Sequence, residues 1–193
     1  MRRPLRGIVS AAVLCAVAAC TSPSPAPREA PAGPAPAESA GGTVTGAPGD
    51  ACTGEDITAE ATVQKAGVAL LTITNTSAAP CRLTGWPKLG LLAADGSALT
   101  VPVREVPQPG PATPADVAPG QSAYAGFRWT SCDKSATDCA VATTLTVAPE
   151  GGGAPVTATF TGVAGGTQTV DELPLSALTV GTLQPSPQGV VAW

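Results

Sequence analysis

Apolar and polar side chains alternate with a period of two along much of the chain after residue 50, which is the pattern of half-buried β-strands. In 57–64, ITAEATVQ, every second residue is apolar, and the residues between them are Thr, Glu or Gln. The run 122–130, SAYAGFRWT, places Phe127 and Trp129 on its apolar face and Tyr124 on its polar face. The other expected strands are 68–75, 89–94, 99–103, 140–148, 155–162 and 177–183. No segment repeats its apolar residues as an amphipathic helix does.

Turn signals separate these runs. Asp95-Gly96 predicts a hairpin, Pro119-Gly120 a turn before 122–130, and Gly151-Gly152-Gly153 a turn before 155–162. The segment 104–121 contains five Pro and is expected to be a long loop. Short strands between frequent turns predict an all-β domain, namely an Ig-like β-sandwich of seven to nine short strands. A closed barrel is the alternative.

The first 20 residues have the organisation of a lipoprotein leader. Three Arg lie among residues 1–6, and residues 8–19 form an apolar stretch that is too short to span a bilayer. The stretch ends in Val17-Ala18-Ala19-Cys20, which resembles the lipobox of bacterial lipoproteins. That resemblance implies cleavage of 1–19 and attachment of diacylglycerol and further acyl chains such as palmitate to Cys20. The alternative is an ordinary secretory signal that leaves Cys20 as a thiol.

Residues 20–50 are expected to be a disordered tether. The segment 21–50 contains seven Pro, seven Ala and five Gly, and Val44 is its one larger apolar residue. Such a sequence buries too little apolar surface to offset the entropy of ordering it. The expected organisation is therefore a signal peptide at 1–19, a lipidated tether at 20–50 and a β-sandwich domain at 51–193. The protein would lie on the extracytoplasmic face of the cell membrane and contact that membrane through its lipid.

The amino-acid composition excludes several classes of function. The chain of 193 residues has 12% charged residues, no His and a net charge of −4. Nucleic acid is not an expected partner, because there is no basic excess. The absence of His excludes Ser-His-Asp, Cys-His and HExxH chemistry. We expect no enzyme, no catalytic residue, no cofactor and no metal.

Two weaker chemical signals lie in one short segment. Ser131 and Lys134 match the S-x-x-K spacing of penicillin-binding enzymes, but they follow a strand, and no other element of that motif set follows. Four residues of this loop offer oxygens to Ca²⁺, which needs six to eight of them: Asp133, Ser135, Thr137 and Asp138. A solvated polar loop is the expected interpretation of both signals.

Six Cys are present, of which Cys15 leaves with the leader and Cys20 carries lipid. The remaining four are an even number in an exported domain, which predicts two disulfides. Three pairings are possible. We expect Cys52–Cys81 and Cys132–Cys139, because the second pair brackets a short polar loop. A zinc site is not expected, since no Cys-x-x-Cys pair is present.

Several short motifs occur in a recognisable order. They are Asn75-Thr76-Ser77, Cys81-Arg82-Leu83-Thr84-Gly85-Trp86-Pro87, Ala118-Pro119-Gly120-Gln121-Ser122-Ala123, and Trp129 before Cys132. This order resembles the actinobacterial lipoprotein domain of unknown function that is numbered 4232, mainly over 52–149. The family also tends to carry a late Cys near its end, which this chain lacks. The resemblance implies an Ig-like sandwich on a surface lipoprotein and carries over no activity or catalytic residue.

Function is predicted only as a class. A non-catalytic binding or interaction module with a cell-wall or envelope protein partner is the first expectation. The alternative is a carbohydrate- or peptidoglycan-binding or wall-modifying protein, for which amphipathic rings suit a recognition surface. The candidate binding residues are Trp86, Tyr124 and Trp193.

Overall fold

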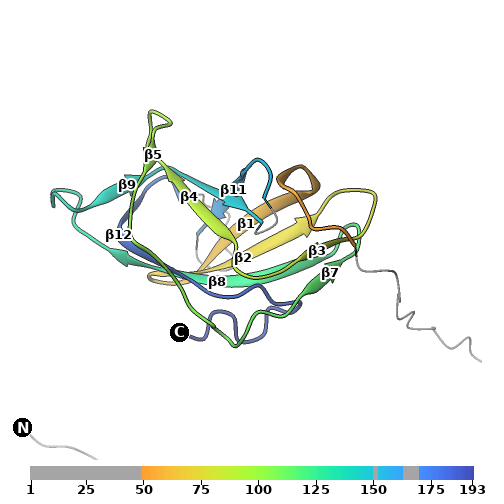
Figure 1. The fold of residues 1–193 in the computed structure, drawn as a ribbon. Helices are drawn as coiled ribbons and strands as arrows, with labels where there is room; N and C mark the ends of the chain where they lie inside the picture. Colours follow the sequence, from red (N-terminus) through yellow and green to blue (C-terminus); the bar gives the residue numbers. More distant parts are fainter. Residues whose placement is uncertain (1–48, 150–151, 163–169) are drawn as a thin grey trace, which may run out of the picture. The chain divides into compact units, whose positions relative to one another are not determined.

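The computed structural model describes residues 49–149, 152–162 and 170–193, and these residues form an all-β domain (Figure 1). A single 3-10 turn, η1 (Gly54–Asp56), precedes twelve strands, and the described residues contain no α-helix. The expected all-β sandwich class is confirmed, with twelve strands in place of seven to nine. The predicted signal peptide, Cys20, the tether up to residue 48 and Gly151 lie outside the described residues.

Most expected strands are present close to their expected bounds. In chain order the strands are β1 (Ile57–Lys65), β2 (Val68–Asn75), β3 (Cys81–Leu83), β4 (Lys88–Leu92), β5 (Ala98–Leu99), β6 (Val103–Glu105), β7 (Ala115–Val117), β8 (Ser122–Ser131), β9 (Ala140–Ala142), β10 (Thr144–Ala148), β11 (Val156–Thr161) and β12 (Leu173–Val180).

Ten strands form one curved sheet in the order β5-β4-β10-β11-β1-β2-β8-β12-β6, with β9 also paired to β12. Figure 1 shows the sheet curving from β4 through β1, β2 and β8 to β12. Its pairs are antiparallel except for β1 with β11 and β12 with β6. β3 and β7 form a separate antiparallel pair. Because the sheet curls upon itself, the sandwich has a barrel-like closure.

The core lies on the concave side of this sheet and is built from small residues and a few large ones. Buried Ala side chains occupy many inward positions of the central strands, including Ala59, Ala61, Ala69, Ala123 and Ala125. The larger buried side chains are Phe127, Leu71, Ile73, Leu175 and Leu178. Phe127, Trp129 and Phe160 gather with ring centroids 6.0 to 6.2 Å apart. The predicted inward face of β8 is therefore confirmed.

The segment that follows β12 covers part of the convex face of β8. Tyr124 and Gln184 exchange two backbone hydrogen bonds of 2.8 Å each. Gly126 lies directly beneath this segment: a Cβ there would stand 1.8 Å from the Val190 carbonyl oxygen and 2.9 Å from Trp193 Nε1. Only glycine permits the segment to lie this close to the sheet.

Four sequence expectations are corrected by the tertiary structure. The single strand expected at 99–103 divides into β5 and β6, because Pro102 lacks the N–H that a ladder needs. The run 140–148 divides at Thr143, because β9 pairs with β12 while β10 pairs with β4 and β11. The long loop expected at 104–121 contains the end of β6 and all of β7. The last strand begins at Leu173, earlier than the expected residue 177.

We predict that Gly126→Ala destabilises the domain by about 1–3 kcal/mol, because the added methyl group displaces the segment that carries Val190. Chemical denaturation checks the value, and Ser131→Ala at the exposed end of the same strand is the control, with an expected change below about 0.5 kcal/mol. Equal stability of the two variants would contradict the close packing at Gly126.

Candidate binding site at the open seam between β4 and β6

The two ends of the ten-stranded sheet are joined by one short stretch of chain. β5 pairs with β4 at one end of the sheet, and β6 pairs with β12 at the other. Only residues 100–102 separate β5 from β6. The extended run 98–105 therefore leaves β4 after Leu99 and crosses to β12. Beyond that point β4 and β6 face each other, and no ladder pairs them.

The backbone of β6 has one paired edge and one open edge. The Leu178 N–H donates to the Pro102 carbonyl at 2.9 Å, and the Val106 N–H donates to the Val180 carbonyl at 3.0 Å. Because alternate residues of a strand direct their backbone groups to opposite edges, Val103 and Glu105 direct theirs away from β12. That open edge faces the seam.

The backbone of β4 has a matching open edge. The Ala93 N–H donates to the Ser97 carbonyl at 2.9 Å, and Leu91 lies opposite Leu99 on the same side. The alternation directs the backbone groups of Leu89 to this side as well. The ladder with β5 stops at Leu99, so the Leu89 edge has no strand beside it.

A groove of about 360 Å³ lies between these two edges. We call it the seam groove, and its lining residues are Pro87, Lys88, Leu89, Val103, Glu105 and Val180. Val180 is buried, and Leu89 packs against the core, so the groove has an apolar floor. Val103 is 51% exposed and is the one large hydrophobic side chain among the described residues with such exposure.

Two side chains at the start of β4 contact the chain at the end of β6: Trp86, which precedes β4, and Lys88, its first residue. The Trp86 indole N–H donates to the Val106 carbonyl at 3.0 Å. Lys88 Nζ lies 2.7 Å from Glu105 Oε1, and both side chains are about half exposed. Trp86 thus fixes one end of the seam groove, while the ion pair is an exposed contact of the kind that contributes little to stability.

The residues that follow β6 are held by a buried hydroxyl. Thr182 is fully buried, and its Oγ1 lies 3.1 Å from the Gln108 carbonyl and 2.9 Å from the Gly110 carbonyl. The Gln184 amide donates to the Pro111 carbonyl at 3.1 Å. The part of 104–121 that the sequence suggested as a loose loop is therefore fastened to the end of β12.

The structure does not bring the three predicted binding residues together. Tyr124 is half-buried on the convex face of β8, and Trp86 lies at the seam. The Trp193 ring lies under the Arg128 guanidinium, 5.2 Å from it, and covers Gly126. Among the described residues no ring contact joins Trp86, Tyr124 and Trp193, whereas the rings that do meet are the interior ones.

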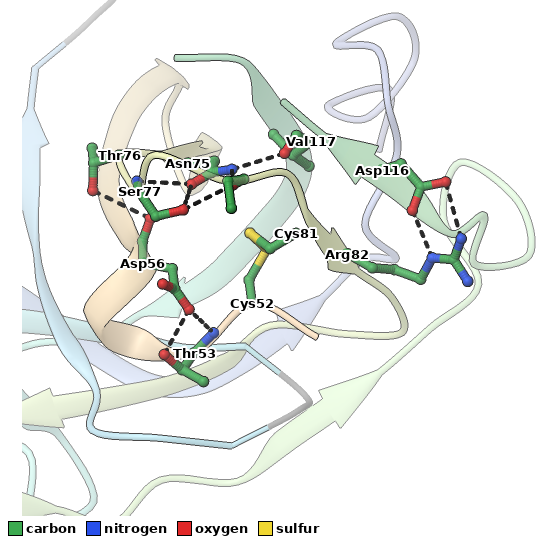
Figure 2. The surroundings of a disulfide bond; sticks show 11 residues. Cys52, Thr53, Asp56, Asn75, Thr76, Ser77, Cys81, Arg82, Asp116 and Val117 are labelled. Carbon is green, nitrogen blue, oxygen red and sulfur yellow. Dashed lines mark hydrogen bonds and ion pairs between the residues drawn. A yellow bond between two sulfur atoms is a disulfide. The ribbon is translucent and has the colours of Figure 1, made fainter. Parts of the chain in front are cut away.

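The two expected disulfides are present. Cys52–Cys81 has a Cα–Cα distance of 4.9 Å and ties the chain before η1 to β3 (Figure 2). Cys132–Cys139 closes the short loop after β8, and Lys134 in that loop forms an ion pair with Glu172. Lys134 is thus engaged with a carboxylate and is not placed as a general base toward Ser131.

Buried Asn75 organises the region around the first disulfide (Figure 2). Its Nδ2 donates to the carbonyls of Ala79 at 2.9 Å and Val117 at 2.8 Å, and its Oδ1 accepts from the Ser77 N–H and hydroxyl. Its backbone also pairs with Gly120 and Gln121. One side chain therefore holds the turn after β2 against the turn after β7.

Exposed carboxylates near these turns are stabilised in their charged form. The Arg82 guanidinium contacts both Asp116 oxygens, at 2.7 and 3.0 Å, and it lowers the pKa of Asp116 (Figure 2). Hydrogen bonds from the Thr53 backbone and hydroxyl lower the pKa of Asp56. Hydrogen bonds from the Ser135 backbone and hydroxyl likewise lower the pKa of Asp133. The Asp133 carboxylate thus accepts hydrogen bonds from within its own turn.

Among the described residues, the Cys, Asp and Glu side chains form no group of three that is arranged to hold a metal ion. The same residues include no helix whose length and hydropathy suit a bilayer crossing.

The order of motifs and the fold agree with the comparison to protein families. Residues 52–184 match the model of the "Domain of unknown function (DUF4232)" family. The chain belongs to this family. Comparison with curated proteins and with solved structures gave no match. The family match runs from the first disulfide Cys to Gln184 and includes both walls of the seam groove, but it supplies no function.

Sequence reasoning did not identify the seam groove in this member of the family. The groove-lining residues come from β4 and the residue before it, from β6 and from β12, and β12 is remote from the other two in the chain. Of this region, the sequence marks only Trp86, next to Pro87, as a candidate. One signal was available: Pro102 interrupts an otherwise regular strand pattern and marks the place where 98–105 changes partner.

We predict that loss of the Cys52–Cys81 disulfide costs more than loss of Cys132–Cys139. In the chain-entropy description, the longer loop contributes about 3.6 kcal/mol and the shorter about 2.5 kcal/mol. Urea unfolding of the two double Cys→Ala variants checks the order. A larger loss for the Cys132/Cys139 variant would contradict it.

A second prediction concerns pH. The pKa of Asp116 is lowered by Arg82, so this pair stabilises the fold above the unfolded pKa of about 3.9 and stops doing so as pH falls through the lower folded value. Asp116→Asn should therefore lower the urea midpoint at pH 7, and the difference from the unmodified chain should shrink as the pH falls below the unfolded pKa of about 3.9. Asp138→Asn, at an exposed carboxylate without an ion pair, should change neither midpoint; a pH-independent effect at Asp116 would contradict the ion-pair account.

Proposed function

We propose that this protein is a lipid-anchored, non-catalytic binding module on the extracytoplasmic face of a bacterial, specifically an actinobacterial, cell membrane. The lipobox-like Val17–Cys20 stretch supports the anchor, and the Pro-, Ala- and Gly-rich segment after it supports a tether. Two disulfides are typical of a domain that works outside the reducing cytoplasm.

The single observation that carries the binding role is the seam groove. It combines an apolar floor, the exposed side chain of Val103 and two strand edges that lack partners. Exposed apolar surface beside unsatisfied backbone groups costs stability and promotes aggregation unless something covers it. An envelope partner seated at the groove supplies that cover.

The anchor is tested with Cys20→Ala and the matched control Cys15→Ala, both in the full-length chain. Cys20→Ala should lose incorporation of a palmitate analogue and leave the detergent phase, because the acceptor thiol is gone. Cys15→Ala removes a leader Cys outside the lipobox and should behave as the unmodified chain does. Continued labelling of Cys20→Ala would contradict the lipid anchor.

The binding role is tested by cross-linking the full-length chain in intact cell envelopes. A specific partner should be lost with Val103→Asp, because a carboxylate would lie on the apolar floor. It should be retained with Thr130→Asp, which places the same charge at an exposed position of β8. A partner retained by both variants, or no cross-link with the unmodified chain, would refute binding at the groove.

A further inference from the structure

Resting on the proposed function, we infer that the occupant of the seam groove is an extended peptide segment of another polypeptide, which adds a strand between β4 and β6. What points to a peptide is the backbone. The open edges of Leu89 on β4 and of Val103 and Glu105 on β6 face each other without a ladder. A peptide strand supplies N–H and C=O groups at the spacing of both edges, which is the basis of recognition by strand addition.

The direction of the added strand follows from the topology. β4 and β5 are antiparallel, and β5 continues into β6, so the two walls of the groove run in opposite directions. A strand between them is antiparallel to one wall and parallel to the other, whichever way it enters. Pro87, Lys88 and Leu89 line one wall, and the three residues of β6 form the other, so about three to five peptide residues are engaged.

The side chains of the groove define the chemistry of the peptide. Alternate residues of the added strand face the floor formed by Val180, Leu89 and Val103, so small or medium apolar side chains are favoured there. The rim offers one cation, Lys88, and one anion, Glu105. Because Lys88 and Glu105 contact each other, they lie at the same point along the groove. A peptide with an acidic and a basic residue close together on its rim-facing side therefore exchanges the existing ion pair for two new ones, which is charge complementarity at that point.

The Lys88–Glu105 ion pair acts as a latch across the groove. Its side chains are about half exposed, so opening it costs little. A second copy of this chain is a poorer occupant than a peptide. Pairing β6 with another β6 would join only three residues on each side, far below the surface of about 1,600 Å² that stable protein interfaces bury.

The test uses the full-length chain and a fluorescein-labelled peptide, Val-Thr-Val-Lys-Val-Glu, followed by fluorescence anisotropy. The control peptide has the same sequence with N-methyl groups on alternate residues, which remove the N–H groups along one edge. The unmodified peptide should bind, and the N-methylated peptide should bind about tenfold or more weakly, because only strand pairing depends on those groups. Equal binding of the two peptides, or binding of neither, would overturn the inference.

Two variants locate the site. Val103→Asp should weaken peptide binding about tenfold or more, while Thr130→Asp should leave it unchanged. The double variant Lys88→Ala/Glu105→Ala should bind the same peptide with Thr in place of its Lys and Glu about two- to fivefold more tightly than the unmodified chain does, because no latch has to open. Weaker binding by the double variant would mean that the ion pair belongs to the site and is not a latch.

Hydrogen exchange gives a readout that does not depend on the variants. The amides of Leu89, Val103 and Glu105 should exchange rapidly in the free chain and slowly with saturating peptide. Protection elsewhere would place the peptide outside the seam groove. A dimer that is seen by sedimentation without peptide and lost in Val103→Asp would replace the peptide with a second copy.

These outcomes separate this inference from the proposed function. If an envelope partner depends on Val103 but the peptides do not bind, the groove holds a ligand other than a strand, and only the inference fails. If no envelope partner depends on Val103, the proposed binding role of the groove fails, whatever the peptides do.

Discussion

The extended run 98–105 pairs first with β4 and then with β12, and the rest of this architecture depends on that change of partner. A sheet with ten strands has two ends, and exposed ends are sites of unwanted pairing. Here one extended run pairs with both ends, so the sheet closes with three connecting residues. The same run cannot lie beside both strands along its whole length, and the seam groove is the geometric result.

The elements around the seam limit how far it opens. Trp86 holds Val106 on one side, and buried Thr182 holds the residues after β6 on the other. The Cys52–Cys81 disulfide and the Asn75 side chain likewise hold the chain in place near β3 and β7. These strands have three residues each and contribute few backbone hydrogen bonds of their own. Cross-links and buried side-chain hydrogen bonds thus stabilise the parts of the domain that have the least regular structure.

The core explains why such cross-links matter. Alanine fills many inward positions of β1, β2 and β8, and an alanine buries little apolar area. One aromatic cluster, Phe127 with Trp129 and Phe160, supplies large side chains to this core of small residues. A core of this kind gains less from burial than a Leu- or Phe-rich one does, so disulfides and anchored turns carry a larger share of the stability.

The sequence by itself determined the β class, the bounds of β1, β2 and β8, the turns at Asp95-Gly96 and Pro119-Gly120, and the number of disulfides. The first three depend on local alternation and turn chemistry, which act between near neighbours, and the last depends on the even number of Cys residues. The expected pairing of Cys132 with Cys139 across a short loop was local as well, whereas Cys52 and Cys81 lie 29 residues apart and are brought together by the fold. The division of 99–103 and 140–148 into two strands each was decided only by the tertiary structure. The partners that divide them are remote in the chain, namely Leu178 for the first run and Leu91 and Leu173 for the second. The tertiary structure also decided the seam groove, because its two walls come together only when the sheet closes. A period of two along the chain shows which face of a strand is buried, but it does not show which strand edges are left without a partner.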